Sequence, residues 1–372
     1  MAQTTLTEFM HDHPAASKLG SEERVQVSIM WPDSQDASQW RHEEYRVNAE
    51  YYYPASVVKW PVLLLALEWI HEQGRGIWTS DAYMVFDTPH SCQSASTQTQ
   101  QRLNQALATR QSIANDIQRI LLVSDNQSFS RLFYLLGPDY IARKLHEKGY
   151  DGTEILKAYD GCSAEARKTW PGVTLFDVNG DTLFQRKSSA ISTLPRDTTP
   201  IPVGRAYMNA DGTLSEPLDF AYQNKLPLHE AVRMLHTFLN LDQSSPSLWN
   251  IHPSDRAMVL DAMHKFPRES IFSDLRKQKD YPDDYKKFIY YGNHSRALKH
   301  GAVEVYNVVG MAYGFMSDLA WIVDVRDGRS VMVAVTVYAN KDGVLNDGHY
   351  DYQSIAMPFF EALGQWALEQ AK

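Results

Sequence analysis

The sequence is poor in cysteine, in net positive charge and in long hydrophobic runs, and each shortage excludes a class of protein. Only Cys92 and Cys162 occur in 372 residues, which excludes a disulfide scaffold and a four-thiolate zinc site; a single disulfide between them stays open. Lys and Arg number 36 against 45 Asp and Glu, so a nucleic-acid-binding protein is not expected. The longest uncharged apolar run, Trp60–Leu67, is far too short to span a membrane.

Several catalytic and cofactor motifs are missing as well. The sequence has no Gly-x-Ser-x-Gly elbow of an α/β-hydrolase and no Gly-Lys pair of a phosphate-binding loop. None of its 13 histidines belongs to a His-Glu-x-x-His zinc motif. We therefore expect neither a metal nor an organic cofactor. The first residues contain no apolar stretch of the kind that marks a secretory signal peptide.

The composition that remains is that of an ordinary globular protein, 44% hydrophobic and 22% charged. Strand-like patterns lie at both ends of the chain, and helical patterns lie mainly between them. The expected strands cover residues 24–31, 43–50, 303–310, 319–325 and 331–339. The expected helices cover residues 56–74, 112–123, 128–136, 139–148, 228–239, 254–265 and 352–371.

This order predicts an α/β (α+β) fold with an antiparallel sheet built from both chain termini and flanked by helices, beside an all-helical lobe. We expect residues 22–55 and 300–372 to form the sheet subdomain. Residues 56–299 should form the helical subdomain, with an irregular insertion at about 151–225 where Gly, Pro and Thr become dense. A cleft is expected between the two subdomains.

The first chemical signal is a Ser-x-x-Lys pair, Ser56 and Lys59, at the start of the buried helix. A spacing of three places both side chains on one helical face. A serine hydroxyl becomes a good nucleophile when a base removes its proton, and a lysine can be that base if burial lowers its pKa. The alternative is that Ser56 caps the helix and Lys59 extends to the surface.

The second signal is Ser124-Asp125-Asn126, which follows a helix ending in Leu-Leu-Val. A second serine near the first can relay a proton to a leaving group, and the Asn126 amide can bind a substrate amide. Alternatively, the three residues are caps between two helices.

The two signals together resemble the serine β-lactamase and penicillin-binding protein superfamily, nearest to class A β-lactamases. The resemblance lies in residues 51–61, Tyr-Tyr-Tyr-Pro-Ala-Ser-Val-Val-Lys-Trp-Pro, and residues 121–126, Leu-Leu-Val-Ser-Asp-Asn. The resemblance implies that Ser56 is the acylated nucleophile, with Lys59 as its base or base partner. It implies that Ser124 is the proton shuttle and that Asn126 contacts the substrate.

The resemblance further implies that substrate also meets the strand at Val309, Gly310 and Met311. The oxyanion hole would combine the N–H of Ser56 with an N–H near Met311. Members of the superfamily mostly work outside the cytoplasmic membrane, so a periplasmic or extracytoplasmic location is implied, with a cytoplasmic one as the alternative.

The sequence departs from the family pattern at two places. The family's Lys-Thr-Gly or Lys-Ser-Gly triplet falls on Val308-Val309-Gly310, so Val308 stands where the lysine belongs. Two lysines that precede x-Gly, Lys299 and Lys341, are out of register with the strand; whether Lys299 replaces the missing lysine in space stays open. The Glu-x-x-Leu-Asn motif, whose glutamate activates the deacylating water in class A enzymes, is absent.

We therefore expect a serine hydrolase of the β-lactamase type that transfers an acyl group from a lactam, amide or ester to Ser56. The close alternative is a D,D-peptidase-like or esterase-like hydrolase. The alternative from another class is a non-hydrolytic β-lactam-binding or sensor protein with a degenerate site. The expected partner is a small-molecule or peptide-like acyl substrate, with no nucleic acid and no membrane span; the oligomeric state stays open.

Overall fold

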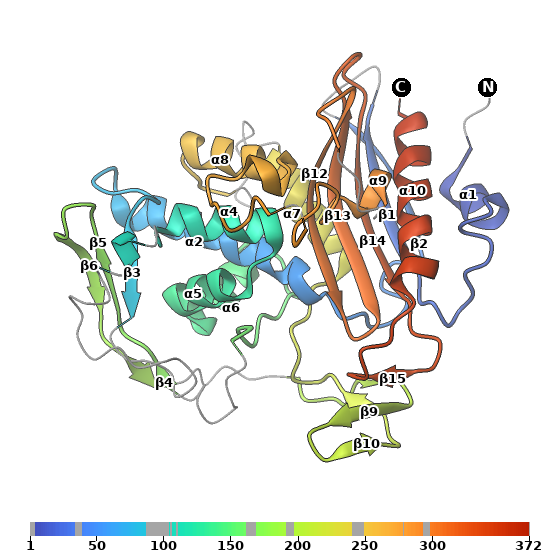
Figure 1. The fold of residues 1–372 in the computed structure, drawn as a ribbon, viewed down its shortest axis with the longest axis horizontal. Coiled ribbons are helices and arrows are strands. Elements are labelled where there is room, and N and C mark those ends of the chain that lie inside the picture. The colour runs from blue at the N-terminus through green and yellow to red at the C-terminus, as the bar shows by residue number, and fades with distance from the viewer. Residues whose placement is uncertain are drawn as a thin grey trace.

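The computed structural model describes residues 4–33, 39–86, 104, 106–108, 111–160, 169–190, 197–239, 249–277, 279–292 and 298–371. Cys92 and Cys162 lie outside these residues. The described part forms a twisted antiparallel sheet with a helical lobe on one face and further helices on the other (Figure 1). The predicted fold class is confirmed.

The sheet has five strands in the order β12-β13-β14-β1-β2, and every neighbouring pair is antiparallel. Its strands are β1 (Gln26–Pro32), β2 (Trp40–Tyr45), β12 (Val303–Ala312), β13 (Phe315–Asp324) and β14 (Ser330–Tyr338). The pairing of β1 with β14 joins the two ends of the chain in one sheet. β2 begins and ends earlier than predicted because the hairpin pairs Pro32 with Trp40, while Arg46 and Asn48 take positive φ angles that end the strand.

Both faces of the sheet are buried, and alternate side chains of each strand enter different cores. Met332 and Ala334 of β14 face the helical lobe, whereas Val333 and Val335 pack against the C-terminal helix. The helices on that outer face are α1 (Leu6–Asp12), α9 (Phe288–Tyr291) and α10 (Met357–Glu369), the last preceded by the π-helical turn η4 (Tyr352–Ala356).

The helical lobe surrounds α2 (Lys59–Gly74), whose first twelve residues are all buried. A helix that is apolar on every side belongs in the centre of a lobe, and α2 ends where Arg75 takes a left-handed conformation just after Gly74. The other lobe elements are α4 (Ile113–Val123), α5 (Asn126–Leu136), α6 (Pro138–Glu147), α7 (Leu228–Leu239), α8 (Pro253–His264) and the short η3 (Pro267–Glu269).

Small sheets form the remainder of the described chain and include most of the predicted insertion. Their strands are β3 (Tyr83–Phe86), β4 (Thr169–Trp170), β5 (Val173–Phe176), β6 (Thr182–Arg186), β7 (Ser189–Ala190), β8 (Pro202–Val203), β9 (Ala206–Asn209), β10 (Gly212–Leu214), β11 (Leu218–Asp219) and β15 (Val344–Leu345). β15 pairs in parallel with β9, which joins the insertion to the loop after β14.

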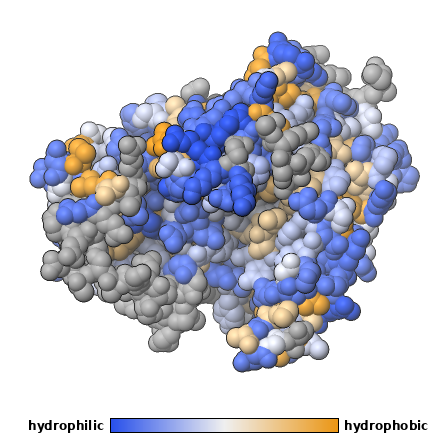
Figure 2. Space-filling view, in the orientation of Figure 1, coloured by the Kyte–Doolittle hydropathy of each residue, from blue (hydrophilic) through white to orange (hydrophobic). Residues whose placement is uncertain are grey.

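The face of the molecule shown in Figure 2 is mostly hydrophilic, and its hydrophobic residues form small separate groups. Among the described residues, no helix is both long and apolar enough to cross a membrane. The apolar α2 is instead enclosed by the lobe.

Candidate active site

Ser56 lies on the wall of a cavity of about 490 Å³ between the helical lobe and the sheet. The cavity brings together the turn that carries Ser56, the start of α5 at Asn126, and the end of β12 at Met311. These segments are far apart in the sequence, and the cavity joins three of the regions that the sequence predicted for the site.

The turn before α2 sets the relation between Ser56 and Lys59. Residues Ala55–Val58 form the 3₁₀ helix η1, and the N–H of Lys59 donates to the carbonyl of Ser56. In a 3₁₀ turn, side chains three residues apart lie one above the other. Ser56 is half-buried at the cavity, while Lys59 is fully buried beneath it. The alternative interpretation, in which Lys59 extends to the surface, is therefore wrong.

The Lys59 ammonium group points at the Ser124-Asp125-Asn126 segment. Its Nζ donates to the Ser124 carbonyl (2.5 Å), to Ser124 Oγ (3.1 Å) and to Asn126 Oδ1 (2.6 Å). Among its hydrogen bonds in the described part of the chain, none goes to Ser56. A neutral amine donates only two hydrogen bonds, so loss of a proton leaves a lone pair that can accept from a hydroxyl.

Burial lowers the pKa of Lys59 to about 7, because a charged ammonium loses its hydration there. The positive charge of Lys286 lowers this pKa further, and the carboxylate of Asp125 opposes the shift. A substantial share of Lys59 is therefore neutral near pH 7, as a base that accepts a proton from serine must be.

Local backbone structure places Ser124 and Asn126. Ser124 ends α4 in a left-handed conformation with φ of 58°, and its N–H donates to the carbonyl of Ile120. Asp125 caps α5 by accepting from the N–H of Ser128 at 2.7 Å. The capping interpretation thus describes Asp125, while Ser124 and Asn126 meet Lys59. Because Asn126 Oδ1 accepts a hydrogen bond from Lys59, the amide Nδ2 of Asn126 is the group that can donate into the cavity.

Gly310 allows β12 to approach the Ser56 turn closely. A Cβ atom on Gly310 would lie 2.3 Å from the Pro54 carbonyl and 3.1 Å from the Ser56 nitrogen. Only a residue without a side chain fits there. The glycine of the proposed third motif therefore lies directly against the backbone of Ser56.

The β12–β13 hairpin directs the backbone of Met311 toward the same turn. Tyr313 and Gly314 both have positive φ angles, and they join the pair Ala312–Phe315 as a tight two-residue turn. Such a turn is closed by a hydrogen-bonded pair, so the next pair, Met311–Met316, has its backbone groups facing away from the partner strand. In the described sheet β12 is an edge strand, and the Met311 N–H therefore faces the open edge.

The side chains of the other two residues of the triplet, Val308 and Val309, are buried on opposite faces of the sheet. Val308 is 2% exposed and packs in the core on the helical-lobe face. Val309 packs in the opposite core beside α10, so its side chain does not line the cavity and only its backbone can face Ser56. Neither side chain supplies a charge.

The two lysines considered as replacements for the missing lysine, Lys299 and Lys341, lie away from Ser56. Lys299 is exposed and precedes β12; the strand from Val303 to Gly310 alone spans about 23 Å at roughly 3.3 Å per residue, so Lys299 does not replace the missing lysine. Lys341 lines a different cavity of about 420 Å³ with Arg24 and Glu50.

Tyrosines form much of the cavity wall, and sequence reasoning did not assign them a role. The cavity is lined by Tyr53, Ala55, Ser56, Asn126, Tyr159, Met311, Ala312, Tyr313, Asn346, Gly348 and Tyr350. None of these described lining residues carries a carboxylate, an imidazole, an ammonium or a guanidinium group. The wall therefore offers hydroxyls, amides and aromatic faces, but no charged partner for a substrate.

Tyr159 also holds the nucleophile turn in place. Its hydroxyl donates to the carbonyl of Ala55 at 2.7 Å, and its N–H donates to Ser130 Oγ on α5 at 3.1 Å. Ala55 has a φ of 45°, an uncommon value for alanine that the surroundings must maintain. Tyr159 lies in the segment with no recognisable pattern, so no signal in the sequence pointed to it.

Lys286 is a second buried lysine near Lys59 that the sequence did not reveal. Its Nζ donates to the carbonyls of Ile120 (3.3 Å) and Leu121 at the end of α4, just before Ser124. Burial lowers its pKa to about 7, and the carboxylate of Asp318 opposes the shift. In its protonated form, Lys286 thus places a positive charge behind Ser124 from a part of the chain that carries no family motif.

Solved structures of β-lactamases share this architecture. A class A β-lactamase from Bacteroides cellulosilyticus matches with a TM-score of 0.52 over 99% of this chain and 98% of its own, at 13% identity. A β-lactamase from Xanthomonas campestris matches with the same score and identity over 98% of both chains. The fold is that of a class A β-lactamase. A β-lactamase from Desulfarculus baarsii matches at 15% identity with a TM-score of 0.50 over 93% of this chain and 92% of its own.

No protein-family model and no curated protein matches the sequence. The β-lactamase fold nevertheless confirms the resemblance seen in the two short motifs. At 13–15% identity the likeness is one of fold, and the chemistry must be argued from the residues around Ser56.

Proposed function

We propose that this protein is a serine hydrolase of the β-lactamase type that forms an acyl-enzyme on Ser56. The observation that carries the proposal is the stacking of Ser56, at the cavity wall, over the buried Lys59, whose Nζ is hydrogen-bonded to Ser124 and Asn126. The β-lactamase fold supports it as an analogy only.

In the proposed reaction, Ser56 Oγ attacks the carbonyl carbon of a lactam, amide or ester while neutral Lys59 accepts the hydroxyl proton. The carbonyl oxygen becomes an oxyanion and accepts hydrogen bonds from the N–H groups of Ser56 and Met311. Ser124, which accepts from Lys59 Nζ, then gives its proton to the leaving nitrogen or oxygen and regains one from Lys59. The carbon–leaving-group bond breaks, and the acyl group stays on Ser56.

The wall of the cavity favours a neutral acyl substrate. Its described lining residues include no cation that could pair with a substrate carboxylate, and Asn126 Nδ2 supplies a donor for a substrate carbonyl. They also include no carboxylate that could activate a deacylating water. We therefore propose fast acylation followed by slow deacylation, which suits an esterase-like or D,D-peptidase-like hydrolase, or a β-lactam sensor, better than an efficient β-lactamase.

The test is to incubate the protein with a chromogenic cephalosporin, a penicillin and simple activated esters, and to follow both product release and intact mass. Turnover supports the hydrolase, and a stable added mass supports the sensor. Neither signal with any of these substrates would reject the acyl-enzyme proposal. An extracytoplasmic location forms part of the proposal and is tested by fractionating cells that produce the full-length protein.

The pH dependence of acylation should report Lys59. Only the neutral amine accepts a proton, so the acylation rate should rise with pH through about 7, the pKa of Lys59, and then level off. Lys286→Met removes a positive charge that lowers this pKa. The rising limb should therefore move to higher pH by a few tenths of a unit, making acylation at pH 7 roughly 1.5- to twofold slower.

Lys287→Met is the matched control for this shift. Lys287 is also buried and donates to the Val305 carbonyl (2.8 Å) and to Asn307 Oδ1 (3.0 Å), but it does not act on Lys59. Both variants should melt at lower temperature, because each leaves buried acceptors unpaired. An upward shift of the limb in both variants, or in neither, would contradict the role given to Lys286.

The missing lysine of the third motif leads to a separate prediction. Val308→Lys should raise the preference for substrates with a carboxylate, such as penicillin, over simple esters by about tenfold, the effect of one charge-assisted hydrogen bond. The Val308 side chain is buried, so the variant should also be less stable. Val308→Met, which adds length but no charge, should leave the preference unchanged. If Val308→Lys changes the rates with both substrate types equally, Val308-Val309-Gly310 is not the counterpart of the family's lysine triplet.

A further inference from the structure

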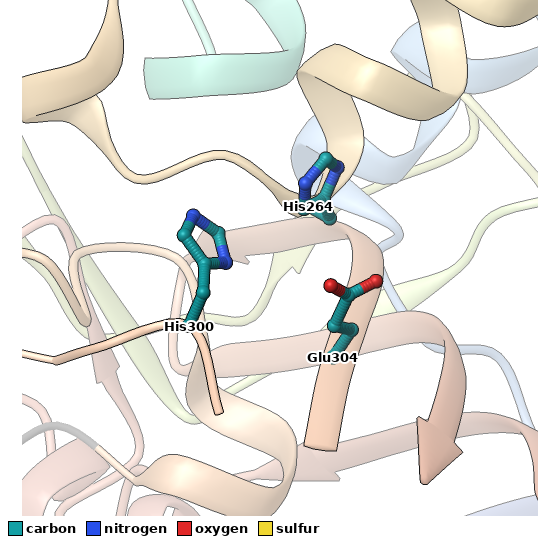
Figure 3. A group of neighbouring side chains, drawn as sticks. All are labelled: His264, His300 and Glu304. Carbon is teal, nitrogen blue, oxygen red and sulfur yellow. The ribbon is translucent and has the colours of Figure 1, made fainter. Parts of the chain in front are cut away.

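A second cluster of chemically capable side chains lies at the opposite end of β12 from Gly310. It consists of His264, the last residue of α8, His300 in the segment before β12, and Glu304, the second residue of β12. One ligand atom from each lies within 4.8 Å of the others. Figure 3 shows the two rings and the carboxylate converging from three separate segments of the chain.

Each of the three side chains forms a hydrogen bond through one of its two possible ligand atoms. The other ligand atom of each side chain is then the one that can bind a metal ion. His300 Nε2 lies 2.8 Å from both oxygens of Glu269, which leaves Nδ1. His264 Nδ1 lies 3.3 Å from the Leu260 carbonyl, which leaves Nε2. Glu304 Oε2 accepts from the hydroxyl of Tyr306 at 2.6 Å, which leaves Oε1.

Metal sites in proteins need such hydrogen bonds, which orient the ligating side chains, in addition to the ligands themselves. A ligating histidine nearly always donates its other ring N–H to a carboxylate or a backbone carbonyl, and ligating carboxylates are themselves hydrogen-bonded. Here Glu269, Leu260 and Tyr306 supply those three outer contacts. Ring packing adds further restraint, since His300 stacks on Phe266 at 4.6 Å and His264 packs on Tyr306 at 5.2 Å.

We propose that His264, His300 and Glu304 bind a divalent transition-metal ion, with Zn²⁺ as the best fit. Two imidazole nitrogens and one carboxylate oxygen form a ligand set typical of zinc, whereas Ca²⁺ and Mg²⁺ prefer oxygen alone. Tetrahedral zinc with bonds of about 2.0–2.1 Å holds its ligand atoms about 3.3 Å apart, so the three side chains close in by up to about 1.5 Å. The side chain of His300 is 36% exposed, which leaves room for this movement and for water as the fourth ligand.

The proposed metal site is separate from the acyl-transfer site. Gly310 lies six positions after Glu304 on β12, a distance of about 20 Å along the strand. A bound ion would join the end of α8 to the start of β12 and so stabilise the strand that carries Gly310. Its ligands are spaced 36 and 4 residues apart and meet only in the fold, so no sequence motif marks the site.

The experiment is calorimetric titration of chelator-treated full-length protein with zinc chloride, together with native mass spectrometry and thermal melting. Wild-type protein should bind one zinc ion and melt at higher temperature with zinc. His264→Ala and His300→Ala should each lose at least about 100-fold in affinity and lose the zinc-dependent rise in melting temperature. Glu269→Gln, which alters only the outer partner of His300, should weaken binding by about 10- to 100-fold.

The control addresses the other histidine-rich segment of the described chain. His11, Asp12 and His13 lie together near the N-terminus, so the double variant with His11→Ala and His13→Ala should keep full zinc affinity. Melting without zinc shows that each variant folds, and the exposed His300 offers a second variant, His300→Asn, should alanine disturb the loop. The proposal is overturned if wild-type protein binds no more zinc than the His264→Ala/His300→Ala double variant. It is overturned equally if the N-terminal double variant abolishes binding while His300→Ala does not.

Discussion

Ser56→Ala is expected to abolish covalent labelling by lactams and activated esters, with the acylation rate falling by roughly 10⁴- to 10⁶-fold. Removing the nucleophile of a serine hydrolase removes the only atom that can form the acyl bond. The side chain is half-buried at a cavity wall, so the free energy of unfolding should change by less than about 0.5 kcal/mol. Intact-protein mass spectrometry and a thermal melt measure the two effects.

Ser21→Ala is the matched control, because Ser21 lines the other cavity, away from Lys59. It should label at the wild-type rate. A Ser56→Ala protein that still gains the mass of the acyl group would place the nucleophile elsewhere. A large drop in its melting temperature would instead indicate that Ser56 is chiefly a structural residue of the turn.

Gly310→Ala is expected to give the second-largest loss. The added methyl group would lie 2.3 Å from the Pro54 carbonyl, so β12 and the Ser56 turn must move apart. That movement separates the two proposed oxyanion donors, and losing one such donor commonly costs about 10²- to 10³-fold in rate. Overpacking of this kind should also lower the free energy of unfolding by about 1–3 kcal/mol. Stopped-flow labelling and denaturant titration measure both.

Gly20→Ala serves as the control for a glycine substitution. Its new methyl group would meet only Glu23 Oε2, at an ordinary contact distance of 3.5 Å. It should change neither the labelling rate nor the stability appreciably. If Gly310→Ala labels as fast as the wild type while remaining folded, the N–H of Met311 plays no part in binding the oxyanion.

The fold was predictable because its strongest signals are local. The short, mostly apolar runs of β13 and β14 and the longer uninterrupted apolar run of α2 each indicate their own structure, and short loops leave few ways to connect them. The boundaries of β2 were less predictable because they depend on hairpin pairing with β1 and on two residues with positive φ angles.

The candidate site was predictable only where function is tied to short sequence spacing. Ser56 and Lys59 are three residues apart, and Ser124 and Asn126 are two apart, so local geometry brings each pair together. Tyr159 and Lys286 reach the site through tertiary packing from segments with no motif, and nothing near them in the sequence indicates it. The side chain of Val309 points into the core beside α10, because successive side chains of a strand point to opposite faces of the sheet. Its backbone remains at the edge of the sheet, on β12.

Locating the acyl group tests the central claim most directly. After labelling with a penicillin or an activated ester, the protein is digested and its peptides are sequenced by tandem mass spectrometry. The account predicts a single acyl group on Ser56, in the peptide that also contains Lys59, and a labelling rate that rises through about pH 7. An adduct on any other residue, or no adduct from either class of substrate, would contradict it.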